Sequence, residues 1–66
     1  MNVKGGSVSF AIEDGVCRLI TAAPRVGYEA KVASATGWTR VDLVRGAHGS
    51  AVFCIGAEGR TDLWEY

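Results

Sequence analysis

The sequence has little of several features that usually reveal what a small protein does. It contains one proline and one histidine, and its seven Lys and Arg residues are balanced by seven Asp and Glu residues. This zero net charge argues against a protein that holds a polyanion mainly by bulk charge, because such domains usually carry a strong basic excess. No apolar run has the length of a membrane span or of the core of a secretory signal. We therefore expect no contact with a membrane.

Cysteine is also scarce. Cys17 and Cys54 are the only two, and they do not form a C-x-x-C motif. Small secreted scaffolds usually contain about four or more cysteines, so this usage favours a reduced protein in the cytoplasm. The alternative is a single disulfide that closes a long loop.

The length sets the size of the core. A chain of 66 residues forms one domain at most, and a domain of this size hides only about 60% of the surface that its unfolded chain exposes. Hydrophobic residues make up 48% of the chain, which excludes intrinsic disorder. Gly5-Gly6 has no structural preference, so we expect residues 1–6 to be a flexible lead-in and residues 7–66 to be a single small β domain.

Nine glycines favour many turns over long helices. Residues 7–13 alternate in the period of a half-buried strand, and Asp14-Gly15 is typical of a two-residue hairpin turn. A second strand then runs over residues 16–23. The cross-strand pairs that this turn predicts are Ile12 with Cys17, Phe10 with Leu19 and Val8 with Thr21.

Residues 28–36 allow two interpretations. Their Ala, Glu and Lys content suits a short helix at about 27–36 that stops at Gly37. As a strand that turns at Thr36-Gly37, the segment instead pairs Val32 with Val41, Ala30 with Leu43 and Lys31 with Asp42. We favour the strand.

The C-terminal half reads as strands over residues 38–45, about 50–56 and about 60–66. Three-residue loops at 47–49 and 57–59, each with glycine at the bulge position, predict the pairs Leu43–Phe53, Val41–Ile55 and Phe53–Leu63. These registers place Cys17 and Cys54 on opposite faces of a sheet, where they could not form a disulfide.

The expected fold is all-β: a five- or six-stranded antiparallel meander curled into an SH3-like or OB-like barrel. The alternative is an α+β fold, ββαβββ, with the short helix at about 27–36.

The predicted registers leave an apolar row on the outer face, formed by Val44, Val52 and Trp64. A monomer rarely exposes such a row, and a domain with a small core gains stability from oligomerisation. Tyr66 and Tyr28 are further anchors, since Trp, Tyr and Arg are enriched where interfaces bind most strongly. The sequence thus predicts a homo-oligomer with this row as its interface.

Catalytic and metal-binding patterns are absent from the sequence. His48 falls in a predicted turn, and no group of Cys, His and Asp residues has the spacing of a metal site. We expect no enzyme activity, no cofactor and no metal.

A basic and aromatic surface is the second functional signal. In the strand interpretation Arg18, Lys31, Trp38 and Arg40 share an outer face, and small β-barrels bind single-stranded nucleic acids through such faces. The leading hypothesis is nevertheless a non-catalytic, self-associating protein that binds another macromolecule and acts as a small regulator or inhibitor of a larger protein complex. A nucleic-acid-binding barrel is the alternative.

Overall fold

The computed structural model describes residues 1–66, which fold almost entirely into antiparallel strands. In chain order these are β1 (Asn2–Val3), β2 (Gly6–Glu13), β3 (Val16–Pro24), β4 (Glu29–Ala35), β5 (Trp38–Arg45), β6 (His48–Ile55) and β7 (Arg60–Glu65), with a 3-10 turn, η1 (Gly56–Glu58), before β7. No helix has the length and apolar character needed to cross a bilayer.

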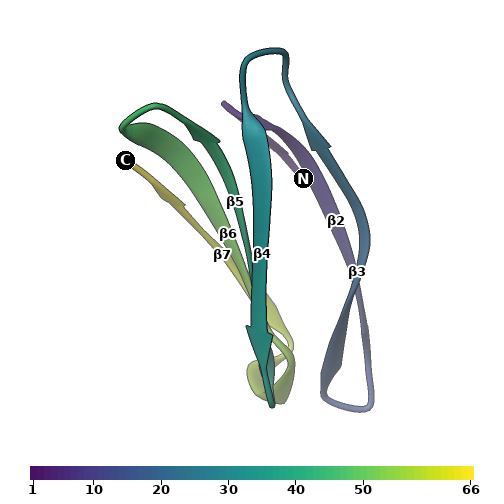
Figure 1. The fold of residues 1–66 in the computed structure, drawn as a ribbon. Coiled ribbons are helices and arrows are strands. Elements are labelled where there is room, and N and C mark those ends of the chain that lie inside the picture. Colours follow the sequence, from purple (N-terminus) through teal and green to yellow (C-terminus); the bar gives the residue numbers. More distant parts are fainter.

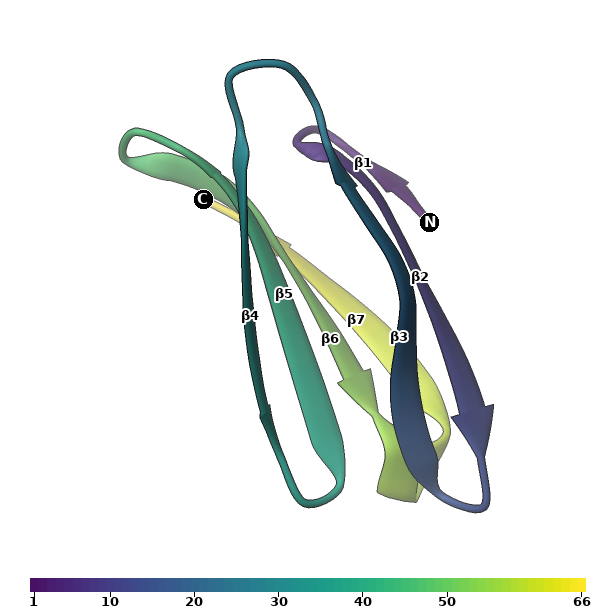
Figure 2. The ribbon, with the colours of Figure 1, turned by 45° about the vertical axis from the view of Figure 1, so that its right-hand side comes forward.

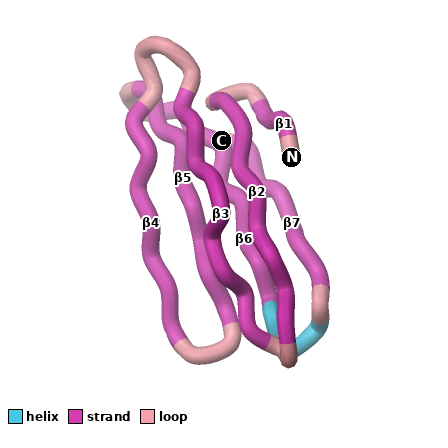
Figure 3. The backbone as a smooth tube through the Cα atoms, turned by 90° about the vertical axis from the view of Figure 1, so that its right-hand side faces the viewer, coloured by secondary structure: helices cyan, strands magenta, loops and turns pink.

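The strands form two separate sheets, in the orders β1-β2-β3 and β4-β5-β6-β7. Figure 1 shows them as two layers, and Figure 3 shows the β1–β3 sheet lying across the β4–β7 sheet with β4 at its margin. Because β3 and β4 do not pair, the meander is split and does not close. The all-β antiparallel class is confirmed, whereas the expected barrel is wrong.

A tight turn at residues 25–28 carries the chain from one sheet to the other (Figure 2). The amide of Tyr28 donates to the carbonyl of Arg25 over 2.9 Å, and Gly27 supplies the positive φ of 91° that the turn requires. This turn separates the end of β3 from the start of β4. Consecutive strands therefore lie in different layers.

The N-terminus belongs to the sheet. Val3 pairs with Gly6 and is buried in the core, and the amino group of Met1 donates to the carbonyl of Val8 over 2.8 Å. Residues 1–6 thus pack on the domain, which differs from the flexible lead-in that we expected.

The β2–β3 hairpin follows its predicted register near the turn. Ile12 pairs with Cys17 and Phe10 with Leu19, as Asp14-Gly15 predicts. A bulge between Ser9 and Phe10 then shifts the pairing by one residue, so Val8 faces Ala22 and not Thr21.

The predicted register of β4 on β5 is confirmed, including Lys31 opposite Asp42 and Val32 opposite Val41. The helical alternative for residues 27–36 is therefore wrong. All seven β4 residues are exposed, because the β1–β3 sheet does not extend over this edge strand. Its apolar side chains thus add little to the core.

The predicted register of β6 is wrong. The β5–β6 turn consists of Gly46 and Ala47, with Arg45 opposite His48 and positive φ at Gly46. Leu43 therefore pairs with Ser50, three positions from the expected Phe53. A shift by an odd number exchanges the two faces of a strand, so Val52 and Cys54 point inward, while Phe53 and Ile55 point outward.

The register of β7 also differs from the prediction, by one position. The η1 turn and Gly59 lengthen the connection, so Leu63 pairs with Val52 and Trp64 with Ala51. The shifts of β6 by three positions and of β7 by one position together exchange the faces of β7 twice. Trp64 therefore remains on the outer face, as predicted. The predicted row of Val44, Val52 and Trp64 nevertheless does not exist, because Val52 is on the other side of the sheet.

The core lies between the sheets, where Val3, Val8, Val41, Leu43 and Val52 form one buried cluster. A disulfide between Cys17 of β3 and Cys54 of β6 joins the two layers. The predictions of a reduced pair and of cysteines on opposite faces are therefore wrong, since the β6 register brings Cys54 to the inner face opposite Cys17.

Candidate functional site: an aromatic face

The outer face of the β4–β7 sheet, which we call the aromatic face, gathers most of the large side chains outside the core. Side chains alternate between the two faces along each paired strand. The larger ones on this side are Trp38 and Arg40 of β5, Phe53 of β6, Trp64 of β7, and Tyr66, which follows β7.

Arg40 stands at the centre of this face. Its guanidinium carbon lies 5.1 Å from the centre of the Phe53 ring and 6.0 Å from that of Trp64, the second distance being at the limit of a cation–π contact. The Trp64 and Tyr66 rings pack at a tilt with centroids 5.1 Å apart. One cation therefore joins two aromatic side chains from different strands.

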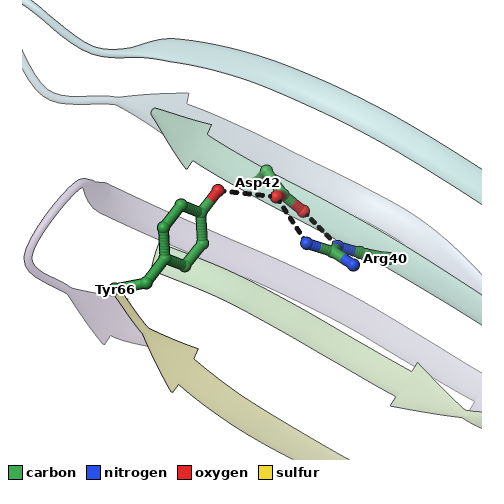
Figure 4. Close-up of polar contacts among 3 residues, drawn as sticks. All are labelled: Arg40, Asp42 and Tyr66. Carbon is green, nitrogen blue, oxygen red and sulfur yellow. Dashed lines mark hydrogen bonds and ion pairs between the residues drawn. The ribbon is translucent and has the colours of Figure 1, made fainter. Parts of the chain in front are cut away.

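Asp42 fixes the orientation of this arginine. Its carboxylate accepts bonds from both Nε and Nη2 of Arg40, at 2.6 and 2.9 Å, and a third bond of 2.9 Å from the hydroxyl of Tyr66 (Figure 4). Hydrogen bonding to Arg40 is the main reason why the pKa of Asp42 is lowered. Hydrogen bonding to Asp42 is the main reason why the pKa of Tyr66 is raised. The ionised carboxylate and the neutral phenol thus stabilise each other.

Two small residues of β6 allow this arrangement. The Tyr66 ring lies so close to Gly49 that an added Cβ would stand 2.7 Å from the ring. Ala51 is on the outer face, yet it is fully buried, because larger side chains on the neighbouring strands cover it. The aromatic face is therefore a packed layer on top of the sheet.

A shallow apolar groove of about 440 Å³ lies at one end of the face. Trp38, Phe53 and Ile55 form its apolar wall, with Arg40 at its side. Trp38 remains 40% exposed and Trp64 55% exposed. The face thus offers both a groove and projecting rings to a ligand.

The predicted interface residues occupy three different environments. Trp64 and Tyr66 lie together on the aromatic face, and half-buried Val44 is on the same side of the sheet. Val52 is fully buried, and Tyr28 packs against the core from the turn between the sheets. Val52 and Tyr28 are therefore not part of one exposed row with Trp64.

The predicted nucleic-acid set is divided between the two sheets. Lys31, Trp38 and Arg40 share the aromatic face, as the β4–β5 register requires. Arg18 follows Cys17 on β3 and points to the outer side of the β1–β3 sheet, because Cys17 points inward. The structure does not bring all four together.

Positive and negative charges balance on the aromatic face. Lys31, Arg40 and Arg60 are matched by Glu29, Asp42 and Asp62. Arg60 forms ion pairs with Glu58 at 2.9 Å and with Asp62 at 2.6 Å, and the hydrogen bond to Glu58 is the main reason why the pKa of Arg60 is raised. The face therefore presents no excess of positive charge.

Sequence reasoning missed Phe53 and Ile55 as members of this face, and it missed Asp42 as the partner of Arg40 and Tyr66. The β6 register error hid the first two, and a different turn assignment at Gly46-Ala47 would have revealed them. Asp42 was predicted only as a partner of Lys31. Comparisons with family models, with curated proteins and with solved structures find no match to this chain.

Proposed function

We propose that the protein is a non-catalytic module that binds proteins through the aromatic face, with a second copy of itself as the first partner. The observation that carries this proposal is the prearranged cluster of Trp64, Tyr66 and Arg40, which leaves large rings exposed. Trp, Tyr and Arg are the residue types that dominate binding energy at interfaces. Their fixed positions also reduce the entropy lost on binding.

The charge balance supports a protein partner over a polyanion. Nucleic-acid affinity comes largely from phosphates neutralised by free cations, whereas the charge of Arg40 is already matched by Asp42. Two copies of a face with three positive and three negative residues do not repel each other as a whole. Self-association is therefore electrostatically permitted, and a role as a small regulator or inhibitor of a larger protein complex fits such a binding module.

The disulfide bears on where this module works. Disulfides persist in oxidising compartments and are rare in the cytoplasm, so Cys17–Cys54 weighs against the cytoplasmic location that we expected from the sequence. A disulfide is also one of the usual remedies for a small core. Self-association is thus supported here by the exposed face, and no longer by the size of the chain.

Sedimentation velocity over a wide concentration range tests self-association. We expect Trp64→Ala to weaken it most and Trp38→Ala less, because Trp64 is the more exposed ring and also contacts Tyr66. Ile20→Ala is the matched control, since Ile20 is 56% exposed but belongs to β3 in the other sheet. A wild-type protein that stays monomeric at high concentration would remove the second copy from the proposal.

Nucleic acid remains the second candidate, because Lys31, Trp38 and Arg40 share one face. A fluorescence titration with a single-stranded oligonucleotide at increasing salt tests it. Binding that weakens steeply with salt and is lost in Lys31→Gln supports this candidate. Absence of binding at low salt eliminates it.

A further inference from the structure

A second pocket, of about 470 Å³, opens at the end of the sandwich where the core stops. Beyond Leu43 the inner face of the β4–β7 sheet continues with Arg45, His48, Ser50 and Glu65. Lys4 and Tyr28 line the pocket from the opposite side, and Tyr66 adds a second ring. Apolar packing between the layers thus gives way to a cavity lined by charged side chains.

The positive groups of this pocket have no partners within the protein. All ion pairs of the chain involve Arg40 or Arg60. The side chains of Lys4, Arg45 and His48 also make no hydrogen bond to any other residue. Arg45 and Lys4 are therefore free to pair with a negatively charged group.

The single carboxylate of the pocket, by contrast, is held in place. Oε2 of Glu65 accepts a bond of 3.1 Å from the hydroxyl of Ser50 and one of 3.2 Å from the amide of Lys4. Ser50 is buried and itself accepts a bond from the amide of Gly5. Oε1 of Glu65 forms no bond in the structure, so one acceptor oxygen is available to a ligand.

We propose that this pocket binds a small anionic sugar, a polyol that carries a phosphate or a carboxylate. The anionic group pairs with Arg45 and Lys4, a hydroxyl of the sugar donates to Oε1 of Glu65, and its apolar ring face packs against Tyr28 or Tyr66. A bare anion fits less well, because Glu65 repels it and no hydroxyl compensates for that repulsion. A neutral sugar fits less well too, because it leaves the two cations unpaired. The pocket shares the Tyr66 ring with the aromatic face, but Arg45, Lys4 and Glu65 lie outside that face, so the proposal does not depend on self-association.

Amide and side-chain NMR titrations at constant ionic strength provide the test, with glucose 6-phosphate, glucuronate, glucose and inorganic phosphate as probes. We expect the two anionic sugars to shift the signals of His48, Ser50 and Glu65, and to bind roughly tenfold or more tightly than glucose or phosphate. Equal affinity for phosphate and glucose 6-phosphate would contradict the sugar part of the proposal. No shift with any probe at about 10 mM would overturn the site altogether.

Variants separate this pocket from general charge effects. Arg45→Gln should weaken both anionic sugars by about tenfold, since it removes a charge-assisted bond. Arg18→Gln is the matched control, because it removes an exposed arginine from the outer side of the other sheet and should leave affinity unchanged. Glu65→Gln keeps an acceptor for Ser50, and we expect it to bring phosphate closer to glucose 6-phosphate in affinity. Equal losses in Arg45→Gln and Arg18→Gln would show non-specific attraction and refute the site.

Discussion

The outer faces of the two sheets occupy equivalent places in the sandwich but are built differently. On the β1–β3 sheet the outward positions hold small and polar residues such as Ser9, Ala11 and Thr21, with Val16 and Ile20 as single exposed aliphatic side chains. On the β4–β7 sheet the outward positions hold four aromatic rings around Arg40.

Exposure alone does not distinguish these two faces. Ile20 is 56% exposed and Trp64 is 55% exposed. Trp64, however, belongs to a set of side chains that contact one another and bury Ala51 beneath them, whereas scattered surface aliphatics are normal in any protein. Mutual contact among exposed residues is therefore the better sign of a binding face.

Breaking the covalent link between the sheets should have the largest effect. The Cys17–Cys54 disulfide spans 37 residues, and a loop of that length corresponds to about 4 kcal/mol of stability from the restricted unfolded chain. The core of a domain of this size rarely supplies more than about 3–5 kcal/mol, so we expect reduction to remove about half of the free energy of unfolding and to lower the urea midpoint accordingly. Urea denaturation followed by circular dichroism, with and without reductant, measures the change.

The double variant Cys17→Ala/Cys54→Ala is the control for reduction. It should be as unstable as the reduced wild type and insensitive to reductant. A wild-type protein whose urea midpoint does not move on reduction would show that the two layers hold together without the disulfide.

The next largest effect is the difference in stability loss between truncating an inward valine of β6 and truncating an outward valine of β5. Val52→Ala removes two methyl groups from a fully buried site and should cost about 2 kcal/mol. Val44→Ala trims a half-buried residue of the aromatic face and should cost less than about 1 kcal/mol. Thermal denaturation of both variants measures the contrast. Equal and small losses would support the register that we predicted from the sequence, in which both valines lie on the outer face.

Turn chemistry explains which parts of the fold could be predicted. Asp14-Gly15 and Thr36-Gly37 each place glycine where the backbone needs positive φ, and both hairpins have the predicted pairs beside their turns. At the β5–β6 connection two glycines compete, Gly46 and Gly49, and only one of them is in the turn. Gly49 is needed for a different reason: the Tyr66 ring lies against it and leaves no room for a side chain.

The candidate site was predictable only in part, because its residues depend on the registers of β6 and β7, which the turns did not reveal. Trp64 was placed on the correct face because two register errors cancelled, and Tyr66 was named only for its residue type, whereas Phe53 and Ile55 were assigned to the core. Residues that come together from distant turns leave no local pattern, as with Lys4 and Arg45 in the second pocket. The disulfide was missed because its geometry depends on the β6 register.

Filling the space beside Tyr66 should disturb the aromatic face more than the fold. The Cβ of Gly49→Ala would lie 2.7 Å from the far end of the Tyr66 ring, which can move, so we expect a stability loss below about 1 kcal/mol. The displaced phenol should lose its bond to Asp42 and weaken self-association. Sedimentation and the NMR signals of Tyr66 report these changes, with Ala11→Ser on the other sheet as a control. If Gly49→Ala self-associates as strongly as the wild type, the position of Tyr66 is unimportant for the interface.

The smallest expected effect is a pH dependence specific to the aromatic face. The pKa of Tyr66 is raised above its ordinary value of 10.0, first by the hydrogen bond to Asp42 and then by burial. Because the pKa of Tyr66 is higher in the folded state, its protonated phenol stabilises the fold below pH 10, and this stabilisation is lost as the pH rises through the folded-state pKa.

Absorbance titration at 295 nm should therefore show Tyr66 ionising at higher pH in the folded than in the unfolded protein. Asp42→Asn should bring the pKa of Tyr66 back toward 10.0, whereas Tyr66→Phe should remove the shifted component of the titration altogether. If Asp42→Asn leaves the alkaline titration unchanged, the hydrogen bond does not form in solution, and the aromatic face loses the contact that orients Tyr66.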